Sequence, residues 1–140
     1  MKQIVKEAKI ENINDMINFV LAGMHEKKSG SKKLIFEIKI ICEEILTNII
    51  KYAYPFEKGE IQLGYYIDEF ENKIILRFCD KGIAFDPTAE SIQNIERDFI
   101  GREIGGLGIN MLKNLANSML YERREGINEL TITKILDEVL

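Results

Sequence analysis

Two polar side chains within a long apolar stretch, residues 32 to 54, have a spacing that could support chemistry. Glu44 and Asn48 stand four positions apart, so on a helix they would lie about 40° apart and share one side. A carboxylate can take a proton from a hydroxyl or a water, and an amide oxygen is a neutral ligand that suits Mg²⁺ beside phosphate oxygens. Glu43 would project from a different side. A solvated glutamate with a surface asparagine would show the same spacing, so the pair alone leaves both interpretations open.

A second candidate follows an apolar strand in "FCDKGIAFDP", residues 78 to 87. Asp80 ends the strand, and Gly82 lets the backbone approach another group closely. A carboxylate at a buried edge can accept a hydrogen bond from an exocyclic amine, such as that of adenine. An ordinary turn at the end of a strand uses the same residue types, so this stretch also keeps two interpretations.

A third candidate is the glycine-rich stretch "REIGGLGINML", residues 102 to 112. Gly105, Gly106 and Gly108 precede an apolar helix, where free N–H groups and the helix dipole favour a phosphate. A loop or a helix C-cap would need glycine as well. No Gly-Lys-Ser/Thr follows, so the stretch is not a Walker A loop.

The elements that must position these residues follow from hydrophobic periodicity. Apolar spacing of three and four predicts helices over residues 12–28 and 32–54, the second capped by Ser31 and stopped by Pro55. Alternation and turn signals predict the remaining elements: strands at 3–10, 60–67 and 73–79, a loop at 88–106, a helix at 107–117, and a closing hairpin of 118–124 and 129–136 around Gly126. This order predicts an α+β fold, a two-layer sandwich in which helices cover one face of a mixed, mostly antiparallel sheet.

Composition narrows the class of protein. A chain of 140 residues with 46% hydrophobic content suits a single domain, residues 1–140, with a real core. A net charge of −4 argues against a nucleic-acid or anionic-membrane binder. No signal peptide is recognised and no run approaches the ~18 apolar residues of a membrane span, so we expect a soluble, cytoplasmic protein. Cys42 and Cys79 lie in apolar runs and are expected to be buried, reduced thiols.

The three motifs together are more specific than each alone. They occur in the order Glu-x-x-x-Asn, Asp-x-Gly, Gly-x-Gly, with a polar loop between the last two. In this order the chain resembles the Bergerat-fold ATP-binding domain shared by gyrase-type ATPases, Hsp90 and histidine kinases. Within that group it most resembles the small anti-sigma factor serine kinases of bacteria. The segments "EEILTNIIKYAYP", "DKGIAFDP" and "GGLGINMLKNLANSMLYERREGINELTITK" carry the resemblance, which spans nearly the whole chain.

The resemblance implies a role for each motif residue. Glu44 would be the general base that activates a substrate hydroxyl, and Asn48 would ligate Mg²⁺. Asp80 would select adenine, and Gly82 would shape the adenine pocket. Residues 88–104 would form a lid over the nucleotide. The remaining nucleotide-binding residues would hold the phosphates of ATP near the helix start: Arg102, Gly105, Gly106, Leu107 and Gly108.

Two positions depart from the family pattern. A basic residue often stands directly before the final glycines of the lid, where this chain has Ile104, with Arg102 two residues earlier. A threonine near the last strand usually supports the adenine side. Thr131 and Thr133 share one face of that strand, but either can be an ordinary strand former.

The resemblance also implies a function. The chain would be an anti-sigma regulatory factor and serine-protein kinase that uses ATP and Mg²⁺. It would phosphorylate a serine on an anti-anti-sigma antagonist and otherwise sequester a sigma factor, and it would form a homodimer. An alternative is a nucleotide-gated protein-binding module without kinase activity.

Overall fold

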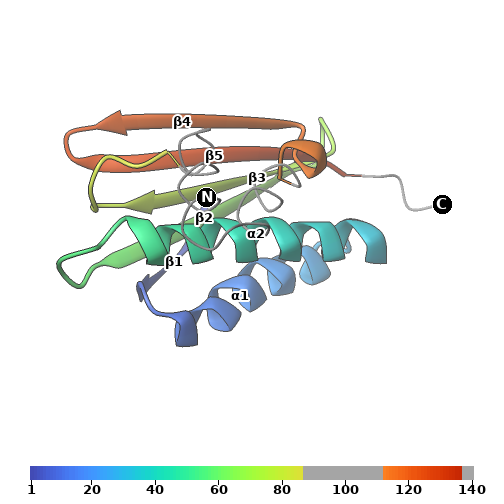
Figure 1. Cartoon of the computed structure of the whole chain (residues 1–140). Helices are drawn as coiled ribbons and strands as arrows, with labels where there is room; N and C mark the ends of the chain where they lie inside the picture. The colour runs from blue at the N-terminus through green and yellow to red at the C-terminus, as the bar shows by residue number, and fades with distance from the viewer. Residues whose placement is uncertain (87–111, 137–140) are drawn as a thin grey trace.

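The computed structural model describes residues 1–86 and 112–136, which form one antiparallel sheet with helices on one face (Figure 1). The strand order is β1-β2-β3-β5-β4, and every neighbouring pair is antiparallel. The strands are β1 Lys2–Glu7, β2 Glu60–Asp68, β3 Lys73–Asp80, β4 Ser118–Arg124 and β5 Ile127–Ile135. The predicted two-layer α+β sandwich is therefore confirmed.

The face of the sheet that meets the helices follows the predicted alternation. On β2 the buried side chains are Ile61, Leu63, Tyr65 and Ile67. On β3 they are Ile74, Leu76 and Phe78. Because side chains in a strand alternate between faces, the intervening residues point to the other face, which we call the open face.

Two helices, α1 Ile13–Glu26 and α2 Lys32–Tyr52, cover the buried face (Figure 1). Ser31 is the N-cap of α2, as predicted, and its Oγ accepts a hydrogen bond from the Leu34 N–H at 3.1 Å. The apolar arc of α2 is buried along its length: Leu34, Ile38, Ile41, Cys42, Ile45, Leu46 and Ile49. The helix ends at Tyr52, close before Pro55, because the residue before a proline disfavours helical geometry.

The ends of two predicted strands differ from the structure. The first strand was expected to run to residue 10 but ends at Glu7, and Ile10–Asn12 form a 3₁₀ turn. The Asn12 side chain donates to the Glu7 carbonyl oxygen at 2.9 Å, which turns the chain toward α1. The last strand begins at Ile127, earlier than expected, because the turn is tight: Glu125 and Gly126 both have positive φ, 51° and 79°.

The two cysteines are free, but they differ in environment. Cys42 is buried within α2, and burial raises the pKa of its thiol to about 12. Cys79 is only half-buried and lies on the open face, so the expectation that both thiols are buried holds for Cys42 alone.

Part of the predicted chain lies outside the described residues. The loop expected at 88–106 cannot be compared, and of the helix expected at 107–117 only residues 112–117 are described, with 112–115 helical. In the described ranges, no helix has the length and apolar character needed to cross a membrane.

The Ser31 cap makes a direct prediction about stability. Ser31→Ala leaves the first turn of α2 without its side-chain acceptor and should lower the free energy of unfolding by about 1 kcal/mol. Urea denaturation followed by circular dichroism measures this difference. Ser29→Ala is the matched control, because Ser29 lies in the same loop but does not cap the helix, and it should change stability by less. Equal losses in both variants would contradict the capping role.

Candidate functional site

Asp80 lies at the end of β3 and is only 4% exposed. Its Oδ1 accepts two hydrogen bonds, from the Gly82 N–H and from Asn128 Nδ2, each at 2.9 Å. Among the described residues, no group donates to its Oδ2. Burial raises the pKa of the Asp80 carboxyl, while the Asn128 and Gly82 hydrogen bonds and the Arg123 charge act in the opposite direction. The protein thus occupies one carboxylate oxygen and leaves the other for a donor that comes from outside this set.

Gly82 has a packing reason to be glycine. A Cβ placed there would lie 2.2 Å from the Ala53 carbonyl oxygen, directly after α2. The Ile83 N–H donates to that same oxygen at 2.9 Å. Because only a residue without a side chain fits against this carbonyl, the Asp-x-Gly stretch brings the end of β3 against the end of α2.

Glu44 and Asn48, which we call the α2 pair, lie on the helix as their spacing predicts. Asn48 is 2% exposed, Glu44 is half-buried one turn earlier, and Glu43 is exposed. Asn48 Nδ2 is buried and has no hydrogen-bond partner among the described residues. A buried amide group without a partner is costly unless a ligand meets it, so Asn48 fits a ligand-binding position.

The Asn48 amide is also compatible with a bound Mg²⁺. An amide can rotate to present its oxygen, which is a suitable ligand for this ion. Within residues 1–86 and 112–136, no group of three His, Cys, Asp or Glu side chains gathers to hold a metal. A magnesium ion at Asn48 would therefore need further oxygen ligands, and nucleotide phosphates supply them in many enzymes.

Aromatic side chains border the same region. The rings of Tyr52 and Phe85 lie 5.3 Å apart between centroids. A cavity of only about 10 Å³ lies beside Asp80, with Phe85 and Tyr121 in its wall. As bounded by the described residues, this cavity is too small for a purine ring.

Asn128 is a candidate site residue that the sequence motifs did not reveal. It is buried, and its backbone pairs with Asp80 across β3 and β5. Its Oδ1 accepts from the Tyr121 hydroxyl at 2.5 Å and from Arg123 Nη1 at 2.9 Å. The sequence held one signal for it: Asn128 stands two positions before Leu130, so on a strand both side chains point to the same, buried face.

The two threonines of β5 lie elsewhere. Thr131 pairs with Arg77, and Thr133 pairs with Ile75, which places both on the open face. Asn128, with opposite phase, faces the helices beside Asp80. The threonines therefore behave as ordinary strand formers, and Asn128 holds the place beside Asp80.

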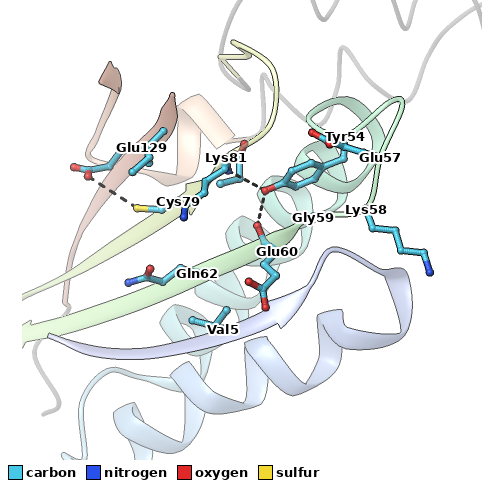
Figure 2. Close-up of a pocket in the computed structure, with 12 residues that line it drawn as sticks. Val5, Tyr54, Glu57, Lys58, Gly59, Glu60, Gln62, Cys79, Lys81 and Glu129 are labelled. Carbon is cyan, nitrogen blue, oxygen red and sulfur yellow. Dashed lines mark hydrogen bonds between the residues drawn. The ribbon is translucent and has the colours of Figure 1, made fainter. Parts of the chain in front are cut away.

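A larger pocket of about 610 Å³ opens at the same end of the sheet (Figure 2). Tyr54 closes one side of it, since its hydroxyl donates to the Glu60 carbonyl at 2.7 Å and accepts from the Lys81 N–H at 2.9 Å. Neither Glu44 nor Asn48 lines this pocket. Its size alone therefore does not make it the reactive site.

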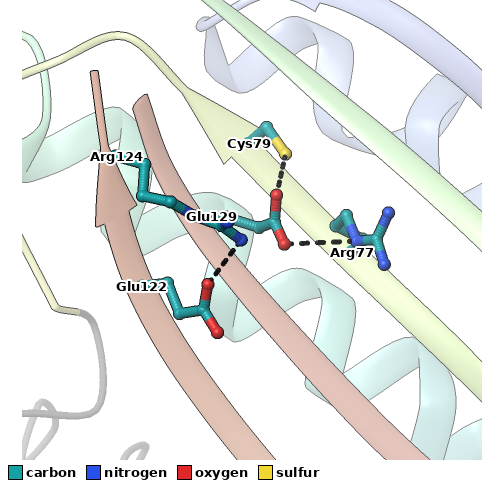
Figure 3. Close-up of polar contacts among 5 residues, drawn as sticks. All are labelled: Arg77, Cys79, Glu122, Arg124 and Glu129. Atoms are coloured by element: carbon teal, nitrogen blue, oxygen red, sulfur yellow. Dashed lines mark hydrogen bonds and ion pairs between the residues drawn. The ribbon is translucent and has the colours of Figure 1, made fainter. Parts of the chain in front are cut away.

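The open face next to this pocket carries paired charges (Figure 3). Glu129 contacts Arg77 Nε at 3.5 Å and accepts from the Cys79 thiol at 3.9 Å. Burial, followed by the charge of Glu129, raises the pKa of Cys79 to about 11. Cys79 is therefore a thiol at neutral pH and a poor nucleophile.

Glu44 and Asn48 lie on α2, and Asp80 and Gly82 lie at the end of β3. The two elements meet where Ile49, next to Asn48, lines the small cavity beside Asp80, and where Ala53 contacts Gly82. The phosphate-binding residues proposed from the sequence all lie outside the described residues: Arg102, Gly105, Gly106, Leu107 and Gly108.

Comparisons with known proteins identify the family of this chain. Residues 7–134 match the histidine kinase-like ATPase domain. The chain is 31% identical over 124 residues to the serine-protein kinase RsbW of Listeria innocua, covering 84% of this chain and 76% of that protein. It is 29% identical over 104 residues to the serine/threonine-protein kinase BtrW of Bordetella bronchiseptica, covering 74% and 72% of the two chains.

Solved structures support the same fold. The histidine kinase domain from the blue-light activated histidine kinase of Erythrobacter litoralis EL346 superposes with a TM-score of 0.54 at 18% identity. The match covers 74% of this chain and 45% of that one; at this identity it supports the fold alone. With the family match across most of its length, the chain belongs to the histidine kinase-like ATPase domains, in the branch that includes the serine-protein kinases.

Proposed function

We propose that this chain is an ATP-dependent serine-protein kinase that acts as an anti-sigma factor. It phosphorylates a serine on an anti-anti-sigma antagonist, and it holds a sigma factor when that antagonist is absent. The observation that carries the proposal is that two polar atoms, Asp80 Oδ2 and the buried Asn48 Nδ2, have no hydrogen-bond partner among the described residues. The elements that carry them are held together by the Gly82–Ala53 contact.

Asp80 is the residue proposed to read the base. An ionised carboxylate only accepts hydrogen bonds, so its Oδ2 suits the exocyclic amino group of adenine. Its Oδ1 is held by Gly82 and Asn128, which keeps the carboxylate from turning away. The base would stand at the aromatic wall formed by Tyr52 and Phe85.

The α2 pair is proposed to serve the phosphate end. ATP with Mg²⁺ supplies the transferable phosphoryl group and charge neutralisation. Asn48 would hold the ion through its amide oxygen, and Glu44 would accept the proton of the substrate serine. The glycines Gly105, Gly106 and Gly108, together with Leu107 and Arg102, would bind the triphosphate at a helix start.

The wider setting of the protein is part of the same proposal. Residues 1–140 would act as one domain in the cytoplasm, as a homodimer, without direct contact to nucleic acid or membrane. The RsbW and BtrW relatives, named as serine and serine/threonine kinases, support a protein substrate.

Replacement of Asp80 should remove nucleotide binding without unfolding the protein. Asp80→Asn keeps an Oδ1 acceptor for Gly82 and Asn128, but one end of the amide now presents N–H groups toward the adenine amine. We expect ADP affinity to fall by about 100-fold, since a site built to bond a polar group is left with a mismatch. Calorimetric titration with ADP and Mg²⁺ measures this loss. Asp15→Asn, an exposed change on α1, should bind ADP as the unaltered chain does.

The same variant should retain its fold. Burial penalises the charge of Asp80 in the free protein, so removal of that charge should leave the melting temperature unchanged or higher. A large drop in melting temperature for Asp80→Asn would mean that Asp80 serves the fold and not the nucleotide.

Glu44 and Glu43 offer a matched pair for testing catalysis. Glu44→Gln removes the proton acceptor and should lower phosphoserine formation by about 10²–10⁴-fold, with ADP affinity within about twofold of the unaltered chain. Glu43→Gln makes the same chemical change at an exposed neighbour and should leave transfer unchanged. The purified chain is incubated with ATP, Mg²⁺ and a candidate antagonist protein, and phosphoserine is detected by mass.

Two outcomes of this assay would change the assignment. Undiminished transfer by Glu44→Gln would remove Glu44 from the mechanism. Tight ADP binding with no transfer to any antagonist would instead favour the nucleotide-gated module without kinase activity.

A further inference from the structure

Three neighbouring strands place a row of polar side chains at one end of the buried face. Asp80 on β3 pairs with Asn128 on β5, and Asn128 pairs with Arg123 on β4. The side chains connect in the same order: Arg123 Nη1 donates to Asn128 Oδ1 at 2.9 Å, and Asn128 Nδ2 donates to Asp80 Oδ1 at 2.9 Å. Asn128 and Asp80 are buried, whereas Arg123 reaches the row from the exposed rim.

The amide of Asn128 is fixed in one orientation. Its Nδ2 also donates to the Ile83 carbonyl at 2.7 Å, and its Oδ1 also accepts from the Tyr121 hydroxyl at 2.5 Å. A rotated amide would turn its N–H groups toward the guanidinium of Arg123 and its oxygen toward the carboxylate of Asp80. Both contacts would then be repulsive, so Arg123 on one side and the acceptors of Asp80 and Ile83 on the other hold Asn128 in the same orientation.

Arg123 also holds the loop that follows Asp80. The same Nη1 atom donates to the Gly82 carbonyl at 3.1 Å. One charged group therefore contacts the asparagine that orients Asp80 and the glycine whose N–H binds Asp80 Oδ1. Hydrogen bonds from a charged donor are stronger than neutral ones.

We propose that Arg123 is a positioning residue for base recognition: acting through Asn128 and Gly82, it holds Asp80 so that Oδ2 faces the base, and so favours an amino-purine over an oxo-purine. This inference rests on the proposed nucleotide-binding function. Adenine presents an amino donor at position 6, whereas guanine presents a carbonyl acceptor there. A fixed, ionised carboxylate accepts from the first and repels the second, while a mobile or protonated one discriminates less.

The charge of Arg123 has a second, independent consequence. Burial raises the pKa of Asp80, and Arg123 opposes that rise. Asp80 itself lines the larger pocket, and Tyr121 shares the small cavity with it. The other titratable groups of the larger pocket are Tyr54, Glu57, Lys58, Glu60, Cys79, Lys81 and Glu129. Loss of the Arg123 charge should move the pKa of Asp80 further upward, so ADP binding should weaken at a higher pH as the solution is acidified.

Arg123 and Arg124 allow a matched experiment. Arg124 neighbours Arg123 in sequence but lies on the open face, where its Nη2 contacts Glu122 Oε2 at 2.7 Å (Figure 3). The full chain and the variants Arg123→Met and Arg124→Met are titrated calorimetrically with ADP and with GDP, in the presence of Mg²⁺. We expect Arg123→Met to lower the ADP-to-GDP affinity ratio roughly tenfold. We also expect ADP binding by this variant to be lost at a higher pH, on acidification, than in the unaltered chain. Arg124→Met should match the unaltered chain in both measurements.

Arg123→Lys tests the charge separately from the guanidinium shape. It keeps the positive charge, so its ADP binding should be lost at the same acidic pH as in the unaltered chain. If Arg123→Lys instead loses ADP binding at the higher pH seen for Arg123→Met, the electrostatic part of the inference is overturned. Because this variant also keeps the rim contact, it supplies the comparison even if Arg123→Met is less stable.

The outcomes separate this inference from the proposed function. If the unaltered chain fails to bind ADP, the proposed function is wrong, and the role of Arg123 falls with it. If the unaltered chain binds ADP and Arg123→Met keeps its ADP-to-GDP ratio, only this inference is wrong. An equal loss for ADP and GDP, or an equal effect of Arg124→Met, would likewise reduce Arg123 to a residue that supports the fold.

Discussion

The close approach of Gly82 to the Ala53 carbonyl is the constraint on which the site depends. It joins the end of a helix to the end of a strand at a distance that no side chain allows. Together with the packing of α2 on the sheet, this contact holds the end of the helix that carries Asn48 against the end of the strand that carries Asp80. The elements that carry the two halves of the proposed site, one for the base and one for the phosphates, are thereby held together by backbone packing.

The polar groups on the two faces of the sheet differ in their exposure to solvent and in their hydrogen bonding. On the open face, charges such as Glu122 and Arg124 meet each other near water, where such pairs contribute little to stability. On the helix side, Asn128 is buried and bonded at both ends of its amide, and Asp80 is buried and bonded at one carboxylate oxygen. The remaining acceptor of Asp80 and the amide of Asn48 stand out because their neighbours are so well satisfied.

Much of this arrangement could be predicted from local pattern. The 3.6-residue period placed Glu44 and Asn48 on one side of α2 and Glu43 on another, because a helix angle depends only on spacing along the chain. Asp80 could be placed at a strand end for similar reasons. The lengths of the first and last strands were harder, since the side chain of Asn12 and a turn with two positive φ values set them.

Asn128 was missed for a different physical reason. Its partner Asp80 is 48 positions away in the sequence, and they become neighbours only because β5 inserts between β3 and β4. The family resemblance pointed to a threonine near the last strand, but Thr131 and Thr133 lie on the face opposite to Asn128, because a strand turns successive side chains to opposite faces. Strand order, which the sequence pattern does not specify, decided that this position of β5 would lie beside Asp80.

If the proposed ligand meets Asn48, the Nδ2 atom that has no partner in the free protein would link folding to the supply of that ligand. In the free chain it is a buried polar group whose desolvation nothing in the described residues offsets. Any compound that bonds this group stabilises the folded form over the unfolded one by mass action. The lifetime of the protein against cellular proteases would then rise and fall with the metabolic state of the cell, apart from any regulation of its synthesis.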